Sequence, residues 1–247
     1  MQRILHTRAR GGAALALGVL LVGVGAGSGL AQQADVQTQK SQAALSPAQA
    51  LELLDKGNQR FTAGKMMKRD LGDQVEATAT GQYPFAVVLG CIDSRVPTEV
   101  VFDQGVGDIF SARVAGNFVN ADILGSMEFA TAVAGSKVVV VLGHTSCGAV
   151  KGACDNVELG NLTQTLSNVA PAVYAVPGHE GKRSSQNKDF VHAVATKNVH
   201  LTVQNVIDRS PVMADLVQKG ELIVIGAMYD VATGEVTWYE EQAHGLE

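Results

Sequence analysis

The sequence predicts an α/β fold, with a mainly parallel central β-sheet flanked by helices and preceded by an N-terminal helical arm. Apolar, largely β-branched runs occur at 85–90, 138–142 and 221–229. Segments with the 3.6-residue spacing of amphipathic helices separate these runs. Because the runs are almost continuously apolar, they are typical of parallel strands that are covered on both faces.

The first predicted helix has a clear start signal. Ser46, Pro47 and Gln49 form a helix start signature, with a Ser N-cap and a capping box, so a helix is predicted over 46–62. The helix at 122–134 is predicted from apolar residues at helical spacing. The other predicted helices are 97–102, 148–156, 162–174 and 188–208, and two further strands are predicted at 108–114 and 235–239.

The first 31 residues are interpreted as a signal peptide. A basic start is followed by an apolar run without acidic residues, and Gly29-Leu30-Ala31 resembles a cleavage site. An uncleaved membrane anchor remains the alternative, because the run is nearly long enough to span a bilayer. Residues 32–45 are expected to be a flexible lead-in, and residues 46–247 one catalytic domain. The protein is therefore expected to be exported, either to a bacterial periplasm or to the exterior.

The charge balance argues against a polyanionic partner. The chain has a formal net charge of −5. Removal of residues 1–31 takes away three arginines and no acid, which brings the charge to about −8. Binding to nucleic acid requires a basic surface, so it is not expected. No basic block points to a membrane surface once the signal is removed.

Two of the three cysteines, together with a histidine, follow predicted buried strands. Cys91 ends the first apolar run, and His144 and Cys147 end the second. Two thiolates and an imidazole suit a zinc ion whose fourth position stays open for chemistry. Cys154 is interpreted as a small buried apolar residue rather than a ligand.

The segments CIDSR (91–95) and HTSCG (144–148) closely resemble the signature of the β-class carbonic anhydrases. The segments GNQRF (57–61) and RVAGN (113–117) fit the same family. The resemblance implies one Zn²⁺ per chain, held by Cys91, His144 and Cys147. It also implies reversible hydration of CO₂ to bicarbonate and a proton by a zinc-bound hydroxide. Asp93 and Arg95 would form a catalytic dyad beside the metal.

The same resemblance assigns substrate-binding positions. Gln82 would donate an amide hydrogen bond to the substrate, and the backbone of Gly148 would bind the same oxygen. The remaining pocket positions are Phe110, Ala115 and Phe129. In a second subgroup the aspartate itself coordinates zinc and a tryptophan lies three residues before the first cysteine. Since Val88 takes that position here, the open form is favoured, and Asp93 would be a ligand only if the site closes.

Family members also suggest how the chain assembles. A homodimer or a dimer of dimers is expected, with Phe110 and Phe129 contributed across the subunit boundary. The first helix would embrace the neighbouring subunit rather than cover its own sheet. Two alternative functions stay open: hydrolysis of carbonyl sulfide or carbon disulfide at the same site, and a non-catalytic zinc- or redox-binding role.

Overall fold

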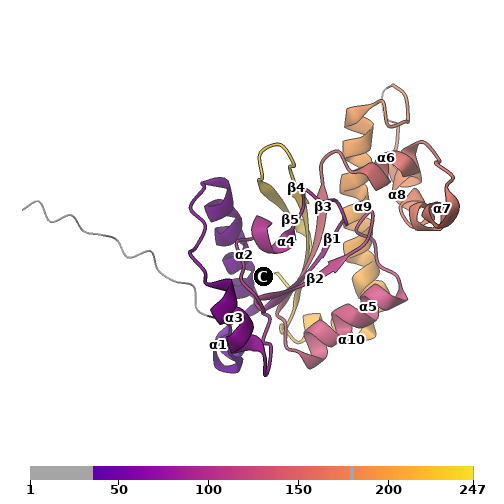
Figure 1. Cartoon of the computed structure of the whole chain (residues 1–247). Coiled ribbons are helices and arrows are strands. Elements are labelled where there is room, and N and C mark those ends of the chain that lie inside the picture. The colour runs from indigo at the N-terminus through magenta and orange to yellow at the C-terminus, as the bar shows by residue number, and fades with distance from the viewer. Residues whose placement is uncertain (1–35, 179–180, 247) are drawn as a thin grey trace, which may run out of the picture. The chain divides into compact units, whose positions relative to one another are not determined.

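In the computed structural model of the chain, residues 36–178 and 181–246 are described (Figure 1). They contain a five-stranded sheet in the order β2-β1-β3-β4-β5. Its strands are β1 (Ala86–Gly90), β2 (Ile109–Arg113), β3 (Val138–His144), β4 (Ile223–Tyr229) and β5 (Val236–His244). The first four strands are parallel and β5 pairs antiparallel with β4, which confirms the predicted sheet.

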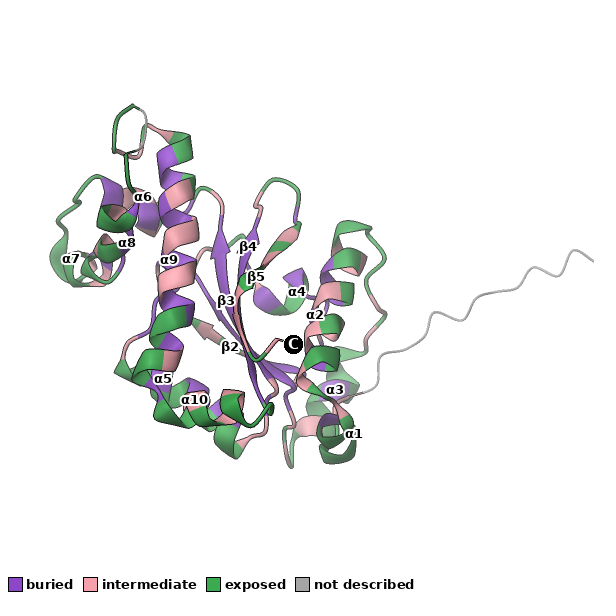
Figure 2. Cartoon of the chain, turned by 180° about the vertical axis from the view of Figure 1, so that it is seen from behind, coloured by how far each residue is buried: buried purple, intermediate pink, exposed green. Residues whose placement is uncertain are grey.

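Helices cover both faces of this sheet (Figure 2). On one face Leu54 and Phe102 pack against alternate side chains of β1, β3 and β4. On the other face Val194 and Val199 of the longest described helix pack against the intervening side chains of the same strands. The first layer contains α2 (Pro47–Thr62) and α4 (Thr98–Val101), and the second contains α5 (Ala121–Glu128), α6 (Gly148–Cys154), α8 (Ala170–Ala175), α9 (Lys188–Arg209) and α10 (Pro211–Gln218).

The segment before the sheet differs from its expectation in two ways. Residues 32–45 were expected to be flexible, but their described part contains helix α1 (Gln39–Ala44). Its Gln42 is buried and donates hydrogen bonds to the carbonyls of Pro84 and Ala134, which ties the helix to the sheet. Helix α2 packs on the sheet of its own chain, because its Leu54 is buried in one cluster with Val140 of β3. Asn58 of the same helix donates to the carbonyls of Val101 and Gly234. The expectation that it leaves its own sheet uncovered was therefore wrong.

Several helical boundaries also differ. The helix predicted at 162–174 is divided into α7 (Gly160–Ser167) and α8. Pro171 has no N–H to donate to the preceding turn, so it cannot continue α7 and instead lies in the first turn of α8. The short helices α3 (Leu71–Thr78) and α10 were not predicted. Helix α5 continues into a π-helix at Phe129–Val133. Among the described residues, no helix combines the length and hydropathy needed to cross a bilayer. The signal peptide predicted at 1–31 lies outside the described residues.

Candidate functional site

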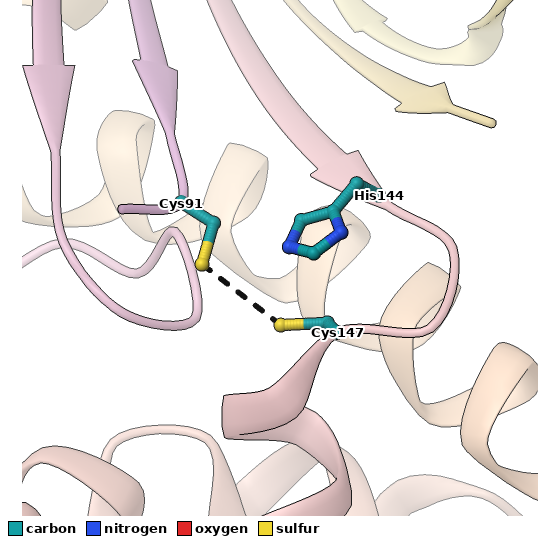
Figure 3. A group of neighbouring side chains, drawn as sticks. All are labelled: Cys91, His144 and Cys147. Atoms are coloured by element: carbon teal, nitrogen blue, oxygen red, sulfur yellow. Dashed lines mark hydrogen bonds between the residues drawn. The ribbon is translucent and has the colours of Figure 1, made fainter. Parts of the chain in front are cut away.

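Three potential metal ligands meet at the carboxyl ends of the two central strands. Cys91 follows β1 directly, His144 is the last residue of β3, and Cys147 is the N-cap of α6. Because β1 and β3 are parallel neighbours, their carboxyl ends meet at one edge of the sheet. The ligand atoms of all three residues lie within 4.8 Å of one another, and the two sulfurs are 4.0 Å apart (Figure 3).

This donor set fits a zinc ion. Nε2 of His144 is buried and has no hydrogen-bond partner among the described residues. The Nδ1–H of the same ring donates to the carbonyl oxygen of Thr145 over 3.0 Å, which leaves the lone pair of Nε2 free to bind a metal. Two zinc–sulfur bonds of about 2.3 Å in tetrahedral geometry place the sulfurs about 3.8 Å apart. The observed spacing is close to that value.

The surroundings of the two thiols favour ionisation of one of them. A hydrogen bond with Cys147 lowers the pKa of Cys91 despite burial, and His144 and the backbone of Gly116 and Asp93 act in the same direction. The pKa of Cys147 is raised by Cys91 and by burial. A dication bound between the sulfurs would offset this repulsion, because metal ligation requires both thiols as thiolates.

Asp93 and Arg95 form a paired arrangement beside the three ligands. Nε and Nη2 of Arg95 donate to the two carboxylate oxygens of Asp93 over 2.9 and 2.7 Å. The backbone N–H of Arg95 donates to the same carboxylate. These hydrogen bonds hold the pKa of Asp93 well below its usual range, against the opposing effect of burial. Oδ2 of Asp93 lies 3.8 Å from Nε2 of His144, so the carboxylate faces the ligand group while Arg95 holds it.

Arg113, at the end of β2, fixes the backbone that carries this pair. Its guanidinium donates to the carbonyl oxygens of Cys91 (2.9 Å) and Asp93 (2.7 Å). Sequence reasoning used Arg113 only as part of a family motif and gave it no role. The available indication was its position at the end of the strand beside β1, where the register pairs it with Gly90.

Two of the predicted substrate-binding positions lie beside the ligand group. Gly148 is exposed at the first turn of α6, directly after Cys147, and nothing lies within 4 Å of the position a side chain would take. Ala115 precedes Gly116, whose amide donates to the sulfur of Cys91. Both are therefore within reach of a molecule bound near the three ligands.

The other three predicted positions lie away from the ligand group of the same chain. Gln82 precedes β1, whereas Cys91 follows it, and the five residues of β1 alone span about 16 Å. Phe110 pairs with Val87, four residues before Cys91, which is about 13 Å along the strand. Phe129 packs edge-on against Phe110 with ring centroids 6.2 Å apart. Within one chain, these three residues do not complete the site.

Phe110 and Phe129 instead line an open cavity of about 740 Å³ between β2 and α5. Half of the surface of Phe129 is exposed there, and Val133 on the following turn is more exposed still. Exposed large apolar side chains grouped in this way indicate a surface that contacts another molecule.

Comparisons with known proteins agree with this geometry. A family profile described as carbonic anhydrase matches residues 86–236. Carbonic anhydrase 2 of Mycobacterium tuberculosis is 36% identical over 195 residues, which cover 76% of this chain and 91% of that protein. The solved β-carbonic anhydrase CcaA has a TM-score of 0.62 and 25% identity, covering 76% of this chain and 87% of its own.

A second solved structure, the Coccomyxa β-carbonic anhydrase in complex with acetazolamide, has a TM-score of 0.60 and 26% identity. The aligned region covers 68% of this chain and 78% of the Coccomyxa enzyme. The family profile, the curated relatives and the solved structures thus all match the part of the chain that contains Cys91, His144 and Cys147. The chain belongs to the carbonic anhydrase family, as an enzyme of the β class.

Proposed function

We propose that this enzyme hydrates CO₂ with one Zn²⁺ per chain, held by Cys91, His144 and Cys147. The observation that carries the proposal is the buried Cys-His-Cys group, in which Nε2 of the histidine has no protein partner among the described residues. When bound, zinc would lower the pKa of a coordinated water and so supply a nucleophile for CO₂ near neutral pH. Two thiolates and one imidazole leave the fourth position for this water.

The residues around the metal would orient the reactants. Asp93, held on both oxygens by Arg95, can accept a hydrogen bond from the nucleophile and so direct a lone pair towards the substrate carbon. The backbone N–H of Gly148, at the start of α6, can donate to an oxygen of the substrate or of bicarbonate. The engagement of Asp93 by Arg95 supports the open form of the site, in which Asp93 is not a ligand.

A rate measurement would test this proposal against its alternatives. Zinc-loaded protein lacking residues 1–31 should hydrate CO₂ rapidly in a stopped-flow assay, and Cys147→Ala should not. Faster turnover of carbonyl sulfide or carbon disulfide than of CO₂ would support the hydrolase alternative. Full zinc occupancy without turnover of any of the three would favour the non-catalytic alternative.

We also propose that two copies of the chain complete each site. Gln82, Phe110 and Phe129 lie far from the ligand group of their own chain, and the two aromatic residues line an open apolar cavity. A second copy could bring these residues to the metal of its neighbour, as the family resemblance implies for Phe110 and Phe129. Dimers or dimers of dimers would also cover the exposed side chains of Phe129 and Val133.

Mixing two inactive variants would test the shared site. Gln82→Ala keeps the ligand group, and Cys147→Ala keeps Gln82. If neighbours share residues, each mixed dimer has one complete site, so random mixing should restore about a quarter of the wild-type activity. Without restoration, or with a fully active monomer in light scattering, the shared site would be refuted.

Export to the periplasm or the exterior is the last part of the proposal. It is supported by the basic start, the apolar run and the Gly29-Leu30-Ala31 site in the sequence. N-terminal sequencing of the protein from a periplasmic fraction should begin at Gln32. Full-length protein in the membrane fraction would indicate a retained anchor instead.

A further inference from the structure

Cys91 has a contact outside the ligand group that connects it to the longest described helix. The backbone N–H of Gly116, in the turn that follows β2, donates to the sulfur of Cys91 over 3.4 Å. The carbonyl of the same glycine accepts a hydrogen bond of 2.8 Å from Nδ2 of Asn198 on α9. Asn198 is only 3% exposed, so this bond is shielded from competing water. Two hydrogen bonds through Gly116 therefore connect the side chain of Asn198 to the sulfur of Cys91.

The turn needs this support because its backbone conformation is unusual. Gly116 has φ +89° and Asn117 has φ +40°, so two successive residues are left-handed. A non-glycine residue in that region costs free energy and persists only where its surroundings hold it. A Cβ at Gly116 would lie 2.7 Å from Cγ2 of Val169, the N-cap of α8, so a larger residue here would have to displace that side chain. Packing and the amide of Asn198 together hold the N–H towards the sulfur.

We propose that Asn198 is a positioning residue of the zinc centre, acting through Gly116 on the thiolate of Cys91. Partners of a metal ligand fix its orientation and tune its donor strength. An N–H directed at sulfur stabilises the thiolate lone pairs, so Cys91 donates less charge to the metal. A more electron-poor zinc polarises its fourth ligand more strongly, which favours the hydration reaction. This inference rests on the proposed zinc site.

Cobalt substitution would test the proposal through a spectroscopic reading. Asn198→Leu has a similar volume but no donor, and Thr202→Val is the matched control, since Thr202 is an equally buried polar residue one turn further along α9. In Asn198→Leu, the thiolate-to-cobalt charge-transfer band should move to longer wavelength, because an unbonded thiolate is oxidised more easily. Zinc affinity in chelator competition should fall about tenfold, because the thiolate loses the contact that orients it and this loss outweighs its gain in donor strength. Thr202→Val should match the wild type in both.

Two results would overturn the proposal. One is a folded Asn198→Leu protein with the wild-type band and wild-type zinc affinity. The other comes from the wild-type protein loaded with a spin-active cadmium isotope, which needs no variant to fold. The amide proton of Gly116 should show scalar coupling to cadmium through the sulfur, and its absence would refute the contact. A wild-type protein that binds none of these metals would instead refute the zinc site itself.

Discussion

Removal of Cys147 is the sharpest test of the metal centre. The apparent free energy of zinc binding to protein sites is about 12 kcal/mol at neutral pH. Shared over three protein ligands, that amounts to roughly 4 kcal/mol each, or about a thousandfold in affinity. Cys147→Ala should therefore lose zinc to a chelator at concentrations that leave the wild-type protein loaded. Activity should fall in parallel, since the remaining two ligands hold the metal weakly.

The chain provides its own control for this experiment. Cys154 lies at the end of α6, is 5% exposed, and belongs to the same apolar cluster as Cys147. Cys154→Ala removes a buried sulfur of the same size without removing a ligand, so metal analysis should still find one zinc per chain. Equal zinc loss in both variants would show that the effect comes from disturbed packing. Full zinc occupancy and activity in Cys147→Ala would refute the assignment of the ligands.

Two further predictions concern carboxylates. Asp93→Asn should keep one zinc per chain but lose at least about a hundredfold in kcat, because a positioned acid–base group contributes at least that much. Near-normal turnover would show that Asp93 and Arg95 are only a surface ion pair. Asp103→Asn should lower the free energy of unfolding by about 3 kcal/mol in urea titrations, because it leaves Arg60 and Arg69 without their buried partner. Burial raises the pKa of Asp103, but the two arginines outweigh it and the net pKa is lowered. The wild-type advantage should therefore shrink below about pH 4, and a difference independent of pH would contradict the ion pair.

The sheet and the ligand group could be predicted because their determinants are local. The strands β1 and β3 are marked by their own apolar runs, and the ligands follow at the ends of those runs. Parallel pairing then brings the two ends together without further information. The start of α2 was equally readable, because Ser46 and Gln49 form the capping box expected from their spacing.

Contacts between distant segments could not be predicted in this way. Helix α1 lies in a segment that was expected to be flexible. It is held in place because Gln42 donates to carbonyls that are 42 and 92 residues away. The path from Asn198 to Cys91 depends on a left-handed turn that no residue pattern specifies beyond the presence of Gly116. The proposed position of Phe129 beside the metal of a neighbouring chain depends on a second copy, which the local sequence does not describe.

Arg95 provides a prediction about pH. Its hydrogen bonds hold the pKa of Asp93 far below the ordinary value of about 3.9. A carboxyl with a depressed pKa is ionised at every pH above that value, and the stabilisation from its pairing is lost only as the pH falls through the lower, folded-state pKa. Loss of activity between neutral and mildly acidic pH in the wild-type protein therefore cannot come from protonation of Asp93. We expect it to come from the ionisation that creates the nucleophile.

Arg95→Ala should change that profile. The pKa of Asp93 then rises towards its ordinary value, yet the group stays ionised above about pH 5. Its freed carboxylate lies 3.8 Å from Nε2 of His144 and can take the fourth position on the metal. Hydroxide competes less well as the pH falls, so the variant should keep its zinc but lose activity more steeply than the wild type on the acid side. Arg95→Lys keeps the charge but not the bidentate hydrogen bonds, so its pH profile should lie between those of the wild type and Arg95→Ala. Parallel pH profiles for all three proteins would refute the view that Arg95 keeps the carboxylate off the metal.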